Sequence, residues 1–142
     1  MVQHSKNLPT SSEVIYLSLD DVLIIHTDQI ERYGGSHGIR DINLLESALF
    51  RPQSSFGGED LYPNFFDKAT VLVHSLLLNH AFVDGNKRTA IASLLVFLKL
   101  NTISLVCTQQ ELIDAAIAIE NKKWNKDNIA SWLATHAEHK KH

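Results

Sequence analysis

The densest group of chemically active side chains in the sequence lies between residues 80 and 89. This segment reads His80-Ala81-Phe82-Val83-Asp84-Gly85-Asn86-Lys87-Arg88-Thr89 and joins the two most apolar stretches of the chain. Ionisable groups are poorly tolerated in such surroundings unless they are paired. A histidine, an aspartate, a lysine and an arginine placed so close together therefore indicate a site whose ligand completes their pairing.

The same segment is suited to bind a phosphate group. We expect a helix to begin at its end, and the first N–H groups of a helix lack intrahelical partners and lie at the positive end of the helix dipole. An anion can bind there. Gly85 lets the chain approach a ligand closely, and Lys87 and Arg88 add two cationic side chains to the same helical turn.

Asp84 and His80 indicate what would happen to the phosphate. A carboxylate at Asp84 would repel it unless a hard cation such as Mg²⁺ lies between them. His80, four residues earlier, is well placed to act as the general base for an incoming hydroxyl. A transition-metal site formed by His80 and Asp84 is an alternative, but Gly85 and the adjacent cationic residues favour phosphate.

Other residues and motif classes carry no comparable signal. A solvated helix end explains Lys87-Arg88 poorly, because cations are unfavourable at the start of a helix. The sequence has no Walker P-loop, GxSxG elbow, CxxC pair or HExxH motif. We expect the remaining single histidines to be surface or core groups without a functional role: His26, His37, His74 and His136.

Six helices are expected to position the segment. Capping residues and apolar spacing predict them from Ser18 to Gly34, from Asp41 to Arg51, over 65–79, over 86–100, from Thr108 to about Asn121, and from near Asp127 to His136. Residues 13–17 are expected to form a short strand and residues 103–107 an extended segment. Residues 86–100, which are apolar on almost every side, are predicted to be the central helix.

The whole chain fits one globular domain. Its 142 residues suffice for a real core, and 44% are hydrophobic and 20% charged. We expect a loose N-terminal arm (1–12), a domain (13–136) and a polar tail (137–142). The single cysteine, Cys107, has no partner for an internal disulfide, which fits a cytoplasmic protein.

Several partner classes are disfavoured. A net charge of -3 and a pI near 6.2 give no basic footprint for nucleic acid. No apolar stretch approaches the ~20 residues that cross a bilayer. Residues 1–12 contain no apolar signal segment. We therefore expect no direct nucleic-acid partner, no membrane association and no export.

Residues 80–88 resemble the signature of the Fic/Doc superfamily, His-x-Phe-x-[Asp/Glu/Asn]-[Gly/Ala]-Asn-x-Arg, without a gap. Lys87 is similar to the Doc (death-on-curing) branch, where many Fic proteins have glycine. The likeness covers about residues 17–132 and includes Tyr33-Gly34-Gly35, Gly38-Ile39-Arg40-Asp41, Leu45-Glu46-Ser47-Ala48-Leu49 with Pro52, and the stretch from Phe56 to Pro63. This resemblance implies an all-α, single-domain helical bundle of about six helices with a short β-hairpin flap.

The resemblance also implies roles for individual residues. His80 would be the catalytic base that activates a Ser, Thr or Tyr hydroxyl of a target protein, and Asp84 would hold Mg²⁺. Phe82 would anchor the loop in the core. The phosphates of ATP would be bound by Gly85, Asn86, Lys87 and Arg88. The flap that pairs with an extended segment of the target would be formed by Phe56, Gly57 and Gly58.

Doc-like proteins are toxins of type II toxin–antitoxin pairs, and the family includes a kinase that arrests translation by phosphorylating elongation factor Tu. The resemblance therefore implies Mg²⁺-dependent transfer of phosphate from ATP to a protein hydroxyl, with the translation machinery, such as elongation factor Tu, as the expected target. Ile91 stands where AMP-transferring Fic proteins usually carry a second arginine, and together with Lys87 it favours kinase chemistry. AMP or other nucleotide transfer is the alternative.

The resemblance finally bears on partners. Self-inhibited Fic proteins carry a Ser or Thr four residues before the glutamate of an inhibitory helix, but here Ala116 precedes Glu120 at that spacing. Inhibition is therefore expected from an antitoxin whose disordered C-terminal segment folds into a groove. A second alternative is a non-catalytic binding module that acts only through this antitoxin.

Overall fold

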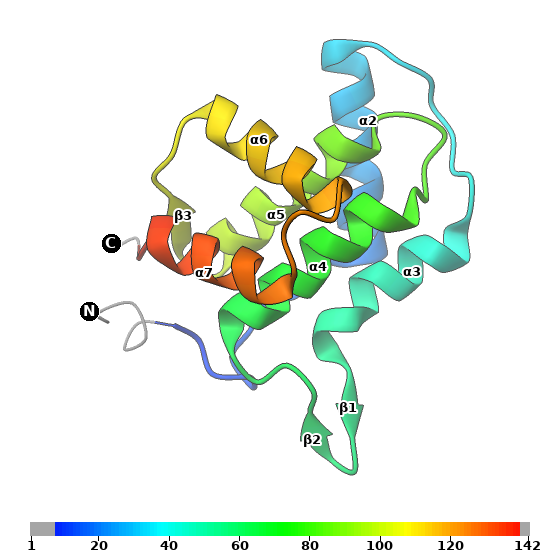
Figure 1. Ribbon diagram of the computed structural model, residues 1–142. Helices are drawn as coiled ribbons and strands as arrows, with labels where there is room; N and C mark the ends of the chain where they lie inside the picture. Colours follow the sequence, from blue (N-terminus) through cyan, green and yellow to red (C-terminus); the bar gives the residue numbers. More distant parts are fainter. Residues whose placement is uncertain (1–7, 140–142) are drawn as a thin grey trace.

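The structure is a computed structural model that describes residues 8–139. These residues contain six α-helices: α2 (Leu19–Tyr33), α3 (Ile42–Phe50), α4 (Phe65–Asn79), α5 (Asn86–Leu100), α6 (Gln109–Glu120) and α7 (Lys126–His136) (Figure 1). A 3₁₀ turn, η1 (Arg51–Gln53), follows α3. Four short strands form two antiparallel pairs, β1 (Ser55–Phe56) with β2 (Glu59–Asp60) and β3 (Ile103–Leu105) with β4 (Ala137–His139). The predicted all-α bundle with a β-hairpin is thus confirmed.

Side-chain caps set the helix boundaries that the sequence predicted. Ser18 caps α2 through a capping box with Asp21, and Thr108 caps α6 in the same way with Glu111. Asp41 accepts hydrogen bonds from the first N–H groups of α3. Each cap supplies an acceptor for N–H groups that the helix itself leaves without a partner.

The central helix is α4, and the prediction that residues 86–100 would fill this place is wrong. Eleven residues of α4 are buried, against six of α5. In Figure 1, α4 crosses the middle of the molecule. Although α5 is apolar, its first turn emerges at the polar segment and its apolar Leu95 and Leu100 are partly exposed. The apolar composition of α5 therefore led to a prediction of more burial than the structure shows.

The strand predicted at residues 13–17 is also absent from the described part of the chain. The backbone there is extended, but it pairs with a side chain. The N–H of Ile15 donates to Oδ1 of Asn101 over 2.9 Å, and Nδ2 of Asn101 donates to the carbonyl of Ile15 over 3.0 Å. The buried amide of Asn101 thus takes the place of a neighbouring strand.

The C-terminal part of the described chain joins the fold. Residues 137–139 fall in the expected polar tail, but they form β4, and Ala137 is buried opposite Leu105 of β3. Residues 1–7 of the expected arm and 140–142 of the tail lie outside the described residues. Between residues 8 and 139 no helix has the length and apolar character needed to cross a membrane.

The β1–β2 hairpin projects from the helical body (Figure 1). Gly57 and Gly58 both have positive φ angles, +61° and +83°, as a two-residue turn matched to strand twist requires. At the base of the hairpin, the N–H of Leu61 donates to the carbonyl of Ser54 over 2.9 Å. The predicted flap residues therefore form a real hairpin, with Phe56 82% exposed.

Candidate active site

His80 stands at the point where α4 ends. It is the C-cap of that helix, with φ 47° and ψ 53°, and its side chain is exposed. A left-handed conformation is rare for a residue other than glycine. It turns the chain out of the helix, so that the next two residues, Ala81 and Phe82, enter the core, each only 3% exposed.

Asn86 closes the loop from Phe82 to the start of α5. Its Oδ1 accepts from the N–H of Phe82 over 3.0 Å, and its Nδ2 donates to the carbonyl of Phe82 over 2.9 Å. The side chain of Asn86 therefore holds the loop. This leaves its backbone N–H, in the first turn of α5, as the group by which it would meet a phosphate.

His26 supports the loop, although the sequence predicted no role for this residue. Its ring stacks on that of Phe82 with centroids 3.8 Å apart, and its Nε2 lies 2.8 Å from the carbonyl oxygen of Asp84. Because a carbonyl only accepts, Nε2 carries the proton. The available signal was its place in the buried register of α2, between Val22 and Ile30.

Asp84 is exposed, and its carboxylate is oriented by two backbone donors. Oδ2 accepts from the N–H of Ser36 over 3.0 Å and Oδ1 from that of Gly85 over 2.8 Å. These hydrogen bonds, that of Ser36 most strongly, hold the pKa of Asp84 below its ordinary value. An ionised, exposed carboxylate beside a helix N-terminus fits a magnesium ligand.

A metal at Asp84 would need further ligands from outside the chain. Among residues 8–139, no three His, Cys, Asp or Glu side chains come together as a metal cage. Mg²⁺ is commonly bound by one or two carboxylates, substrate phosphates and water. The donor set therefore fits an ion shared between Asp84 and a phosphate ligand.

The two cationic residues of the segment have partners of their own. Nζ of Lys87 lies 3.4 Å from Oε1 of Glu120, at the end of α6. Nη2 of Arg88 donates to the carbonyl of Gly34 over 2.9 Å, and its guanidinium lies 5.9 Å from the ring centre of Tyr33. Both side chains are only partly buried, so they stand at the surface of the site.

Residues 34–41 run beside the loop and pair with it. The N–H of Val83 donates to the carbonyl of Gly38 over 3.0 Å, and Ile39 forms a β-bridge with Phe82. Gly35 lies so close that a Cβ there would come within 2.7 Å of Oδ2 of Asp84. Two segments about 45 residues apart in the sequence thus build one site.

A pocket adjoins the cationic end of the site. It has a volume of about 580 Å³ and lies between α2, α5 and α6. Arg88 and Ile91 of α5 form one wall, and Leu112 of α6 forms another. We call it the α2–α5–α6 pocket.

The structure brings six of the predicted site residues together but not the three flap residues; the six are His80, Asp84, Gly85, Asn86, Lys87 and Arg88. Asp41, at the start of α3, donates its N–H to the carbonyl of Ala81 over 3.0 Å. The hairpin that carries Phe56, Gly57 and Gly58 follows the other end of this nine-residue helix (Figure 1). A ligand touching both places would have to extend along α3.

Comparison with known proteins shows the family to which the chain belongs. Residues 16–98 match the model of the Fic/DOC family. The chain is 40% identical over 121 residues to a protein named Toxin Doc from Mycolicibacterium smegmatis, covering 84% of this chain and 91% of the relative. It is 31% identical over 118 residues to a protein named Protein kinase doc from Escherichia phage P1, covering 83% of this chain and 92% of that relative. The chain therefore belongs to the Fic/DOC family.

Proposed function

We propose that this protein is a Doc-type toxin that transfers the γ-phosphate of ATP to a hydroxyl group of a target protein. The observation that carries the proposal is the arrangement of the His80–Arg88 loop. An exposed histidine at the end of α4 and an ionised aspartate stand beside the N-terminus of α5, next to two cationic side chains. The two relatives, one named a toxin and one a kinase, support the same activity.

His80 acts as the base in the proposed reaction. It takes the proton of the target hydroxyl, whose oxygen then bonds to the γ-phosphorus as the bond to ADP breaks. The N–H groups at the start of α5 and the side chains of Lys87 and Arg88 bind the phosphates. Lys87 must exchange Glu120 for the nucleotide, which a partly exposed ion pair permits because such pairs are weak.

Asp84 is the proposed magnesium ligand. A bound Mg²⁺ supplies charge neutralisation at the phosphates. Asp84 contributes a carboxylate that stays ionised because Ser36 and Gly85 donate to it.

Two residues favour phosphate over AMP transfer. Lys87 occupies the turn where the phosphates bind, and Ile91, one turn further along α5, lines the α2–α5–α6 pocket with an apolar side chain. Where AMP-transferring Fic proteins usually carry a second arginine, this chain therefore presents an apolar side chain. The name of the phage relative, a protein kinase, points the same way.

The proposed target is part of the translation machinery, such as elongation factor Tu, and the proposed inhibitor is an antitoxin. The α2–α5–α6 pocket suits an amphipathic antitoxin segment because its walls are largely apolar and Arg88 lies on one of them. Leu95 of α5 lines the same pocket, so Leu95→Asp would place a charge among its apolar side chains. This substitution should abolish copurification of a small antitoxin from the native host.

Labelled ATP tests the activity directly. Purified protein is incubated with Mg²⁺, host cell extract and ATP labelled at either the γ- or the α-phosphate. We expect label on an extract protein from γ-labelled ATP alone, and none with His80→Ala. Label from α-labelled ATP alone would replace the kinase proposal with AMP transfer.

Two further arms complete the test. Omission of Mg²⁺ should remove the label. If neither form of ATP labels any protein while the antitoxin still binds, the protein is a binding module and the proposed transferase activity is wrong.

A further inference from the structure

The conformation of His80 requires support from outside α4. A non-glycine residue in the left-handed region is disfavoured by roughly 1 to 3 kcal/mol unless its surroundings hold it there. The three consecutive carbonyl oxygens of Asn79, His80 and Ala81 follow the end of the helix, where α4 itself offers no partner. Whatever binds these oxygens also fixes the direction in which the His80 side chain leaves the backbone.

One residue binds all three carbonyls. Nε of Arg40 donates to the carbonyl of His80 over 2.6 Å, and its Nη2 donates to that of Asn79 over 2.9 Å. The backbone N–H of Arg40 donates to the carbonyl of Ala81 over 2.7 Å. Arg40 therefore spans the turn that contains His80 and places a positive charge at the negative end of the α4 dipole.

Arg40 is itself held in place on both sides. On one side, Ile39 forms its β-bridge with Phe82. On the other, Asp41 caps α3 and donates its N–H to the carbonyl of Ala81. The backbone of Arg40 is thus fixed, so that its guanidinium reaches two carbonyls at once. A lysine, with a single ammonium group on a flexible stem, lacks this planar fork.

We infer that Arg40 is the positioning residue for the catalytic base. Its guanidinium donates to the backbone carbonyls of Asn79 and His80, so in the proposed reaction it acts by setting the orientation of His80 and hence the rate of proton removal. The inference rests on the proposed role of His80. A purely structural helix cap would change stability without changing the orientation of the His80 ring or the turnover of folded protein.

Three variants test the inference: Arg40→Met, Arg40→Lys and a matched control, Arg51→Met. Arg51 also approaches α4, with Nη1 3.5 Å from Oγ of Ser75, but this contact is made five residues before His80. Folding of each variant is checked by circular dichroism. Arg40→Lys retains the positive charge, so it serves as the milder variant if Arg40→Met does not fold.

The first readout is independent of activity. The NMR resonances of the His80 ring, recorded in the intact protein at one fixed pH, are expected to move in Arg40→Met, to move less in Arg40→Lys and to stay in place in Arg51→Met. Unchanged His80 ring resonances in a folded Arg40 variant would overturn the inference, whether or not the protein proves to be a kinase.

The second readout is transfer of the γ-phosphate label to the extract protein as ATP is varied. We expect the limiting rate to fall by at least about tenfold in Arg40→Met, since a small misplacement of a reacting group can lower rates by that much or more. The KM for ATP should stay within about twofold. Equal limiting rates in Arg40→Met and Arg51→Met would overturn the inference, whereas no transfer by the unmodified protein would count only against the proposed function.

Discussion

At the scale of single residues, the site is built from side chains that are fixed by backbone groups. The side chain of Asn86 is hydrogen-bonded to the backbone of Phe82, and that of His26 is hydrogen-bonded to the carbonyl of Asp84. The carboxylate of Asp84 accepts hydrogen bonds from two backbone N–H groups. Backbone donors and acceptors move little because their own segments are anchored. The site therefore has its geometry before any ligand arrives, which lowers the reorganisation needed for reaction.

The orientation of Asp84 gives a pH-dependent prediction. Because its pKa is lowered in the folded protein, Asp84 contributes stability above the unfolded pKa of about 3.9, and this contribution is lost as the pH falls through the folded value. Urea unfolding should show the protein to be more stable than Asp84→Asn at pH 7, with the difference shrinking toward pH 3. A stability difference that does not depend on pH would contradict the lowered pKa of Asp84.

The contact between Gly35 and Asp84 gives a second prediction with a built-in control. Gly34 and Gly35 both have positive φ angles, +87° and +117°, so alanine at either should lower stability by roughly 1 to 3 kcal/mol. Only at Gly35 would the new Cβ meet Oδ2 of Asp84, whereas a Cβ at Gly34 meets open space. Label transfer should therefore fall at least about tenfold further in Gly35→Ala. Similar activity in the two folded variants would show that the close approach has no role.

The sequence predicted the residues of the loop but not the residues that support it. His80, Asp84 and Arg88 stand out because charged groups between apolar helices are unusual. His26 and Arg40 look ordinary in the sequence, since their partners lie 58 and 40 residues away. Only the folded chain reveals that Arg40 meets the end of α4.

At the scale of elements, local rules explain the successes and tertiary contacts the failures. The ends of α2, α3 and α6 follow from caps within a few residues, so the sequence predicted them well. The strand expected at 13–17 is missing because Asn101, 86 residues from Ile15, satisfies the backbone there. No local sequence pattern shows whether an extended segment will pair with a strand or with a distant side chain.

The hairpin depends on a buried lysine of α4. Nζ of Lys68, whose side chain is fully buried, donates to the carbonyl of Pro52 over 3.0 Å and to Oδ2 of Asp60 over 3.1 Å. Pro52 lies in η1, just before the hairpin, and Asp60 lies on β2. Lys68 therefore ties β2, and the turn that leads into the hairpin, to the central helix.

Lys68→Met tests this attachment. The apolar stem is retained but the carbonyl of Pro52 loses its donor, so we expect a loss of about 1 to 3 kcal/mol in urea unfolding. Hydrogen exchange at the N–H of Leu61 should also become faster. The exposed Lys99 provides the control, and Lys99→Met should change stability by less than about 0.5 kcal/mol. Unchanged hydrogen exchange at Leu61 would mean that the hairpin is stable without the contacts of Lys68.

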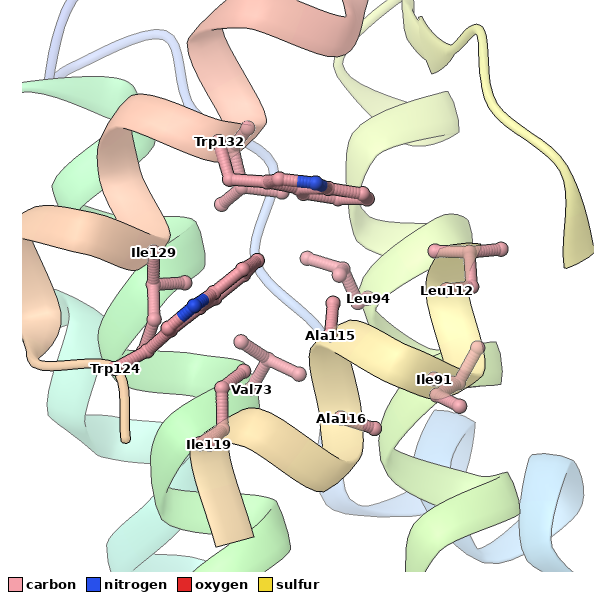
Figure 2. A pocket seen from close by; sticks show the side chains of 11 residues that line it. Val73, Ile91, Leu94, Leu112, Ala115, Ala116, Ile119, Trp124, Ile129 and Trp132 are labelled. Atoms are coloured by element: carbon pink, nitrogen blue, oxygen red, sulfur yellow. The ribbon is translucent and has the colours of Figure 1, made fainter. Parts of the chain in front are cut away.

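At the scale of the whole molecule, α6 connects the core to the site. One of its faces covers a small apolar cavity of about 20 Å³, toward which Trp124 and Trp132 point from the opposite side (Figure 2). Its other face forms a wall of the α2–α5–α6 pocket, and Ile91 and Leu112 line both spaces. The last residue of α6, Glu120, pairs with Lys87. We therefore expect a change in the packing of α6 to reach the site through these shared side chains.

Two core truncations separate this connection from stability in general. Ile119, at the cavity, is 4% exposed and Leu45, on α3, is fully buried. Alanine at either should lower the free energy of unfolding by about 2 to 5 kcal/mol. The chain has only two tryptophans, and both line the cavity, so the fluorescence emission of the folded protein should change in Ile119→Ala but not in Leu45→Ala.

Label transfer, measured at a temperature where both variants are folded, should fall further in Ile119→Ala because α6 also forms a wall of the pocket beside Arg88. If the two variants lose stability and activity in parallel with the same emission, the cavity is only a packing defect and α6 does not couple the core to the site.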